Sequence, residues 1–178
     1  MINKTLSTFF LLWMTTSLYA SESIYSVLLQ WTDENGSKIE LSAYREHFVI
    51  ITMTYTTCKS TCPLIMKKLK KIYNDITATS NIDFVIVTFD PTVDTPKVLS
   101  KFKKSHKVDM PNWHFLNGTG TTTRKLSTLL DIGYQKNPNT GHFMHDNKII
   151  LLDKEGRIIL TLNGLDAAVE PLFKATQR

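Results

Sequence analysis

The chain has 178 residues, of which 42% are hydrophobic, and it carries 21 Lys and Arg against 16 Asp and Glu. This length and composition predict one globular domain that buries a core without depending on disulfides, and they exclude a repeat array or a low-complexity protein. The resulting net charge of +5 suits a protein that works near an anionic membrane surface.

Residues 1–20 have the layout of a secretory signal peptide, with Lys4, an apolar run over residues 9–14 and the small residue Ala20. The apolar run is shorter than the ~20 residues that span a bilayer, so we expect cleavage after Ala20. Leu18, three residues before the cleavage point, leaves an uncleaved anchor that holds the protein at the membrane as the alternative. Residues 21–178 then form a single domain in the periplasm or on the outer face of the inner membrane, where nucleic acid is not an expected partner.

Two short strands open the domain, over residues 26–32 and 38–41, joined by a turn at Asn35-Gly36. The run "HFVIITMTYTT" over 47–57 predicts a central strand covered on both faces. Apolar residues then recur at helical spacing between lysines after the cysteines, which predicts a helix with one buried face. They are Ile65, Leu69, Ile72 and Ile76.

A second buried strand is expected over 82–90, followed by a helix from Pro96 with Thr95 as its N-cap. Further elements complete the order: a short strand over 113–118, a helix over 120–133 closed by Gly133, a loop over 134–146, strands over 147–153 and 157–164, and a helix from about 165 to 176. Two parallel crossovers followed by an antiparallel hairpin and a closing helix predict an α/β, thioredoxin-like fold. Its central mixed sheet is flanked by helices, and the N-terminal β-hairpin is an addition.

Cys58 and Cys62 form a CxxxC segment where the buried strand gives way to the helix. The carboxyl edge of an open α/β sheet carries its functional sites, and the helix dipole together with Lys59 favours a thiolate. Residues four apart on a helix have Cβ atoms about 5–6 Å apart, whereas a disulfide needs about 3.5–4.5 Å. In an oxidising compartment a structural disulfide is the usual role, but a loop of this length restrains little chain entropy. A redox couple and a metal site remain open.

A metal held by two thiolates needs further ligands, and an imidazole would suit copper or zinc. We predict that His47 and His106 are solvated surface residues and that His114 is a satisfied structural residue. His142 and His145 remain, in the loop that leads into a strand of the sheet.

Three segments resemble motifs of the SCO/SenC family and occur in the same order. "YTTCKSTCP" is similar to the family's CxxxCP motif, "VTFDPTVDTPKVLSKF" to its D-P-x-x-D-T-P segment, and "MHDNKIILLDKEGRI" to its distal histidine, strand and turn. The resemblance implies copper ligation by Cys58, Cys62 and His145, with His142 as a loop residue. It also implies delivery of copper to the binuclear copper centre of cytochrome c oxidase subunit II, with a thiol reductant protein as a second partner.

The chain departs from the family at two positions beside these residues. Lys59 stands where the family often has proline, and its charge should lower the pKa of the thiols. Asp146 follows the histidine where serine is frequent, and it either orients the imidazole or bonds the backbone of the turn.

Other side chains near the motifs have structural explanations. Asp90 is expected to shape the turn after its strand rather than to serve the cysteines, and Asp94 or Thr95 to cap the next helix. Met53 and Met66 are expected to fill the core, while Met144 stays a candidate soft ligand because it precedes His145.

The sequence therefore predicts an exported, monomeric copper-binding thiol protein whose reduced dithiol binds the ion and whose disulfide is the inactive form. The alternative is a periplasmic thiol-disulfide oxidoreductase that keeps acceptor cysteines reduced and needs Cys58 and Cys62 but not His145. A non-catalytic exported domain with a structural disulfide is the third interpretation.

Overall fold

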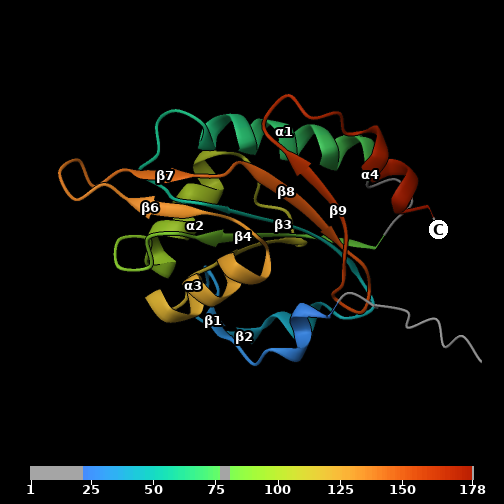
Figure 1. The fold of residues 1–178 in the computed structure, drawn as a ribbon, viewed down its shortest axis with the longest axis horizontal. Helices are drawn as coiled ribbons and strands as arrows, with labels where there is room; N and C mark the ends of the chain where they lie inside the picture. Colours follow the sequence, from blue (N-terminus) through green and yellow to red (C-terminus); the bar gives the residue numbers. More distant parts are fainter. Residues whose placement is uncertain (1–21, 77–80, 178) are drawn as a thin grey trace, which may run out of the picture.

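The computed structural model describes residues 22–76 and 81–177, and a five-stranded sheet in the order β5-β4-β3-β8-β9 lies at its centre (Figure 1). Its strands are β3 (Phe48–Thr54), β4 (Ile82–Thr88), β5 (Trp113–Leu116), β8 (Lys148–Leu152) and β9 (Ile158–Asn163). β3, β4 and β5 are parallel to one another. β8 pairs antiparallel with both of its neighbours, β3 and β9. The sheet is therefore mixed, as predicted. The predicted signal segment, residues 1–20, lies outside the described residues.

Helices cover both faces of the sheet, which explains why every residue of β3 and β4 is buried. One face packs on α1 (Cys62–Ile76), α2 (Pro96–Ser105) and α4 (Glu170–Ala175). The other packs on α3 (Gly120–Leu129) and on the N-terminal segment. Alternate residues of β3 divide between the two cores, with Ile50 in the first and Ile51 in the second. No helix within the described ranges combines the length and the apolar character needed to cross a bilayer.

The N-terminal segment contains the predicted hairpin, β1 (Gln30–Thr32) with β2 (Lys38–Glu40), between the short helices η1 (Ile24–Ser26) and η2 (Leu41–Tyr44). Asp33 Oδ1 accepts hydrogen bonds from the backbone N–H groups of Asn35 and Ser37, at 2.9 and 2.7 Å. Gly36 has φ 90°, a conformation that glycine adopts without strain. The α/β architecture with an added N-terminal hairpin confirms the predicted thioredoxin-like fold.

The predicted loop over 134–146 is wrong, because these residues form a second hairpin, β6 (Tyr134–Lys136) with β7 (Phe143–His145). Its turn is closed by the Gly141 N–H, which donates to the Asn137 carbonyl at 2.8 Å. Tyr134 and Phe143 are half-buried against the core on the α3 side of the sheet. That packing stabilises strands too short to produce a recognisable alternation in the sequence.

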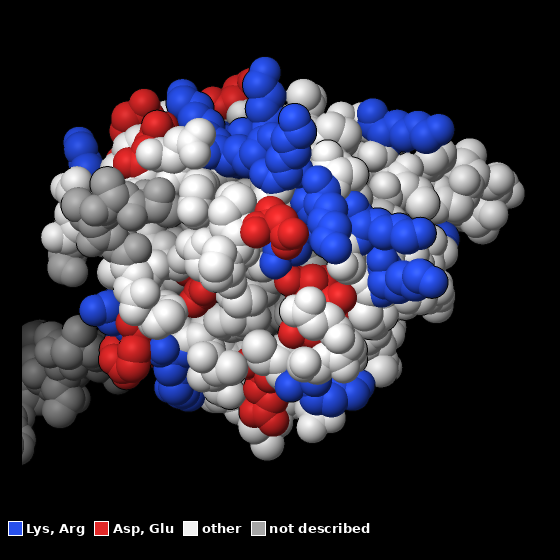
Figure 2. Space-filling model, turned by 180° about the vertical axis from the view of Figure 1, so that it is seen from behind, with Lys and Arg blue, Asp and Glu red and all other residues white. Residues whose placement is uncertain are grey.

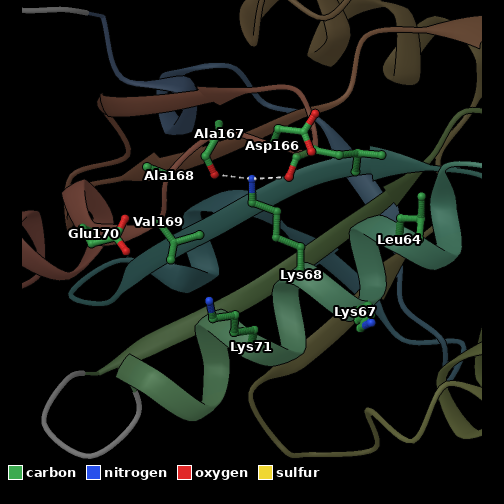
Figure 3. A pocket seen from close by; sticks show the side chains of 10 residues that line it. Leu64, Lys67, Lys68, Lys71, Asp166, Ala167, Ala168, Val169 and Glu170 are labelled. Carbon is green, nitrogen blue, oxygen red and sulfur yellow. Dashed lines mark hydrogen bonds between the residues drawn. The ribbon is translucent and has the colours of Figure 1, made fainter.

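The ends of two helices also differ from the prediction. α3 ends at Leu129 rather than at Gly133, because Asp131 takes the left-handed conformation (φ 51°) and the Ile132 N–H donates to the Ser127 carbonyl at 2.8 Å. The last helix begins at Glu170 rather than near 165. Lys68 Nζ donates to the carbonyls of Leu165 and Ala167 at 2.9 and 2.6 Å (Figure 3), so the segment before α4 is held in a non-helical path.

Candidate metal centre

Three sequence-predicted residues meet at one edge of the sheet. One donor atom from each of Cys58, Cys62 and His145 lies within 4.8 Å of the other two. Cys58 lies in the loop after β3, Cys62 is the first residue of α1 and His145 is the last residue of β7. Within residues 22–76 and 81–177 this is the one group of three or more His, Cys, Asp or Glu side chains arranged to hold a metal ion.

The CxxxC loop folds around the Cys58 sulfur. The Cys62 N–H donates to Cys58 Sγ at 3.4 Å, and the hydroxyls of Ser60 and Thr61 lie 3.6 and 3.8 Å from the same sulfur. Thr61 directly precedes α1, and its carbonyl accepts the hydrogen bond of the Ile65 N–H at 2.9 Å. The sulfur of Cys58 thus occupies the position at a helix N-terminus where backbone N–H groups stabilise an anion.

This geometry gives the two thiols opposite acidities. Burial raises the pKa of Cys58, but hydrogen bonds from Cys62 and Ser60 outweigh it and lower the pKa to about 5. Burial raises the pKa of Cys62 far above its ordinary value, and the neighbouring Cys58 adds to that rise. The prediction that both thiols have a lowered pKa is therefore right for Cys58 and wrong for Cys62, and the main cause at Cys58 is hydrogen bonding rather than the charge of the exposed Lys59.

The imidazole of His145 is oriented by the backbone. Its Nδ1 lies 3.0 Å from the carbonyl oxygen of Asp146, and since a carbonyl can only accept, Nδ1 carries the hydrogen. In the neutral ring, Nε2 then holds the lone pair that binds a metal. The Asp146 carboxylate accepts from the Gly133 N–H at 2.8 Å, so of the two roles predicted for this side chain the backbone bond is observed.

Aromatic rings enclose His145 on the side of the core. The ring centroids of Phe89 and Tyr55 lie 4.8 and 5.9 Å from the imidazole. Phe143, two residues before His145 on the same face of β7, packs on Tyr55 at 5.0 Å. These rings were not predicted as parts of the site, because a strand of three residues gives too short an alternation to identify it in the sequence.

Asp90 connects the hairpin to the turn after β4. Its Oδ1 accepts from the Thr92 hydroxyl at 2.8 Å, which is the predicted turn-shaping role. Its Oδ2 also accepts from Lys136 Nζ at 2.9 Å, and Lys136 belongs to β6, the strand that pairs with the His145 strand. This ion pair between residues 46 positions apart left no pattern in the sequence.

Asp94 fastens the loop before the cysteines instead of capping α2. Its buried carboxylate accepts from the Thr56 N–H at 3.0 Å and from the hydroxyls of Thr56 and Thr88. Thr95 does occupy the N-cap position of α2, but its side chain makes no capping hydrogen bond. The N-cap position of α2 was therefore predicted correctly, but the expected capping hydrogen bond from a side chain is absent at Thr95.

The remaining candidates do not reach the three donors. Met53 and Met66 are buried core residues, as predicted. His142 is exposed, and Met144 is 69% exposed. Because successive residues of a strand point to opposite faces, Met144 projects away from the face that carries His145.

The other histidines have structural partners. His47 and His114 flank the carboxylate of Asp83, with N–O distances of 2.6 and 3.0 Å. His114 is thus the satisfied residue that was predicted. The side chain of His47 is 38% exposed, as expected for a surface residue, but it is also paired with Asp83. His106 Nδ1 lies 3.0 Å from the Phe102 carbonyl, so it too is partly fixed.

Comparison with known proteins identifies the family. Residues 23–178 match the model of the SCO1/SenC family. The chain belongs to this family. A SCO1 protein homolog of Bacillus subtilis is 23% identical over 75% of this chain and 71% of its own length. A SCO2-like protein of Rickettsia typhi is 28% identical over 71% of this chain and 64% of its own length.

Solved structures of SCO1/SenC proteins share the fold. BsSco, described as a member of the Sco family of cytochrome c oxidase assembly proteins with a disulfide switch, superposes with a TM-score of 0.76 at 17% identity, covering 89% of this chain and 94% of that one. Yeast Sco1 with copper bound gives a TM-score of 0.72 at 20% identity, covering 84% of this chain and 86% of that one. These likenesses establish the architecture around the candidate metal centre.

Proposed function

We propose that this SCO1/SenC protein binds copper through Cys58, Cys62 and His145 and delivers it during assembly of the binuclear copper centre of cytochrome c oxidase. The observation that carries the proposal is the convergence of two sulfurs and one imidazole within 4.8 Å. A copper-bound relative in yeast and the description of BsSco as a cytochrome c oxidase assembly protein support it.

The donor set suits copper. The three donor atoms lie up to 4.8 Å from one another. To bind one ion with metal–sulfur bonds of about 2.3 Å and a metal–nitrogen bond of about 2.0 Å, the donor atoms need to move toward one another by about 1 Å or less. Thiolates and imidazole are ligands that copper accepts in both oxidation states. Structural zinc almost always takes four protein ligands, and the described residues supply three.

The residues of the site have separate parts in copper transfer. Cys58 is 6% exposed and Cys62 is fully buried, so Cys58 is the sulfur that an acceptor cysteine reaches first. Its low pKa supplies a thiolate without a separate base. His145, half-buried on the edge of the hairpin, is the ligand that can be exchanged while Cys62 still holds the ion.

Oxidation provides a way to switch the site off. A disulfide between Cys58 and Cys62 would consume both sulfur donors, releasing two protons and two electrons to an oxidant such as another protein's disulfide. A thiol reductant protein would restore the dithiol. The disulfide switch named for BsSco is consistent with this gating.

Copper titration of the reduced protein tests the proposal. Wild type and His142→Ala should bind one copper ion with equal affinity, whereas His145→Ala should bind at least tenfold more weakly and Cys58→Ser should lose tight binding. Equal affinity of His145→Ala and His142→Ala would refute the ligand set. His142 is the matched control because it lies on the same hairpin.

A thiol-disulfide oxidoreductase is the second candidate, and the unequal thiols favour it. Cys58, with the lower pKa, is 6% exposed, and Cys62, with the higher pKa, is fully buried; this is the arrangement of an attacking and a resolving cysteine. Under this alternative His145→Ala would leave cytochrome c oxidase assembly in cells intact, while either cysteine substitution would abolish it.

A location outside the cytoplasm would suit the proposed copper function. We propose a periplasmic or membrane-anchored location, because the N-terminal sequence has the pattern of a signal peptide and the site would meet an acceptor there. Detection of the protein in a periplasmic extract, as opposed to the washed membrane fraction, distinguishes cleavage from anchoring.

A further inference from the structure

Six exposed lysines form a band across α1 and α2, visible as a run of blue side chains on the face shown in Figure 2. They are Lys67, Lys71, Lys97, Lys101, Lys104 and Lys107, and we call them the lysine band. Within α1 and α2 the first five recur at helical spacing, so in each helix they project from one side. Lys107 lies two residues after the end of α2. α2 contains no acidic residue, and α1 contains only Asp75, near its end.

The lysines of the band are not paired with acidic side chains among the described residues, although the exposed Asp109 lies near them, 3.8 Å from Lys103 Nζ. No lysine of the band forms an ion pair with a residue in the described part of the chain, whereas Lys103, Lys136, Lys148 and Arg157 all do. The other lysines of the two helices are already engaged: Lys68 and Lys70 donate to backbone carbonyls, and Lys103 is paired with Glu34. Figure 3 shows the bonds of Lys68. The band holds 6 of the 21 Lys and Arg of the chain.

The band begins beside the metal centre. A groove of about 330 Å³ between α1 and the end of α2 is lined by Pro63, Lys67 and Lys107, among others, and Pro63 directly follows Cys62. Two exposed apolar side chains lie on the segments that flank the thiols: Leu64 at the start of α1 (51% exposed) and Val93 in the turn after β4 (43%). Exposed apolar side chains near exposed charged ones are found together in protein interfaces.

From these features we infer that the lysine band is the docking surface for an acidic face of the copper-accepting protein. Carboxylates of the partner pair with the lysines, its apolar surface covers Leu64 and Val93, and its metal ligands are thereby brought to Cys58. A protein is favoured over a lipid surface because the band leads to the thiols, where transfer requires a partner's ligands. The inference rests on the proposed function for the identity of this partner.

Charge reversal with a matched control tests the docking. The test variant Lys67→Glu/Lys71→Glu/Lys104→Glu reverses the charge of three exposed lysines of the band. The control variant Lys38→Glu/Lys125→Glu/Lys154→Glu makes the same change in net charge with exposed lysines outside the band. The probe is the soluble domain of cytochrome c oxidase subunit II from the same organism, copper-free and reduced, with affinity measured by calorimetry at about 50 and 300 mM NaCl. Circular dichroism and thermal unfolding check that each variant is folded.

The band variant should bind at least about tenfold more weakly than wild type at low salt and lose most of its salt dependence, while the control stays within about twofold. Lys→Gln substitutions at the same three positions should give a smaller loss in the same direction. Equal behaviour of the two charge-reversal variants overturns the inference. The inference is also overturned if wild type does not bind the domain. Binding of wild type to vesicles containing phosphatidylglycerol through these lysines, without binding to the domain, is one such result.

The metal-free assay separates this inference from the proposed function. If docking depends on the band but the protein binds no copper, the copper function fails and the docking surface stands. If copper binds through Cys58, Cys62 and His145 but docking does not depend on the band, the copper function stands and the docking surface fails.

Discussion

Cys58 and Cys62 differ in burial and in hydrogen bonding although both belong to one short loop. The N–H of Cys62 points at the sulfur of Cys58, which stabilises charge on Cys58 and, through that charge, opposes ionisation of Cys62. The dithiol therefore loses its first proton readily and its second with difficulty. Metal binding removes the second proton, because a metal ligand must be the thiolate.

Alkylation of Cys58 should report its low pKa directly. Because the pKa is lowered to about 5, Cys58 is a thiolate at neutral pH, and its rate with iodoacetamide should fall only as pH drops through about 5. Cys62 should not react with the folded protein at pH 7. Mass spectrometry of timed samples gives both rates, and Cys62→Ser isolates Cys58 while keeping a hydroxyl donor. A midpoint near the ordinary thiol value of about 8.5 would show that the hydrogen bonds do not act as described.

Asp83 should stabilise the fold through its two histidines. Burial raises the pKa of Asp83, but hydrogen bonds from His114 and His47 outweigh it and hold the pKa below its usual range. The stabilisation is thus present above the ordinary pKa of about 3.9 and is lost as pH falls through the lower folded value. Asp83→Asn should cost about 1–3 kcal/mol near neutral pH, with a smaller difference from wild type in strong acid.

Urea unfolding at several pH values measures this difference. Asp75→Asn, an exposed carboxylate on α1, is the matched control and should leave stability unchanged. A cost for Asp83→Asn that is independent of pH would contradict the assignment to ionised Asp83.

At the scale of elements, the β6–β7 hairpin decides where His145 lies. It is joined to the sheet edge by the Lys136–Asp90 pair and by the packing of Phe143 on Tyr55. Lys136 Nζ also lies 5.1 Å from the centre of the Phe143 ring. One side chain thus contacts both the turn after β4 and the strand that carries the imidazole.

Loss of this connection should weaken copper binding without removing a ligand. In Lys136→Gln the hairpin loses its ion pair with Asp90, so the imidazole is held less firmly, and we expect about a tenfold loss of copper affinity. Lys125→Gln, on exposed α3 surface, is the control. Competition with a copper chelator measures both, and equal affinity of the two variants would show that the hairpin does not depend on this pair.

The elements that the sequence predicted correctly are those with strong periodicity. Long buried apolar runs identify β3 and β4 in the sequence, and apolar residues at helical spacing identify α1. The three-residue strands β6 and β7 could not be predicted, because they pack on Phe89 and Tyr55, the residues that directly follow β4 and β3. The start of α4 could have been predicted from Pro171, because proline is common in the first turn of a helix. The end of α3 could not, because nothing in the sequence shows that Asp131 takes a left-handed conformation.

At the scale of the whole molecule, the fold separates three tasks. The sheet brings Cys58 and Cys62 to its carboxyl edge, the hairpin adds His145, and the α1–α2 face gathers the positive charge. The first two parts of the site were predictable, because the cysteines follow a buried strand and the histidine lies in a motif that resembles one family. The lysine band was not, because its lysines come from two helices whose relative placement only the tertiary structure gives.

The central claim is that one copper ion is bound by two sulfurs and the imidazole of His145. X-ray absorption at the copper edge of the loaded, reduced protein tests it most directly. The site geometry predicts two sulfur scatterers and one nitrogen scatterer in wild type and in His142→Ala, and loss of the nitrogen in His145→Ala. An unchanged nitrogen scatterer in His145→Ala, or a copper site without sulfur in wild type, would contradict the claim.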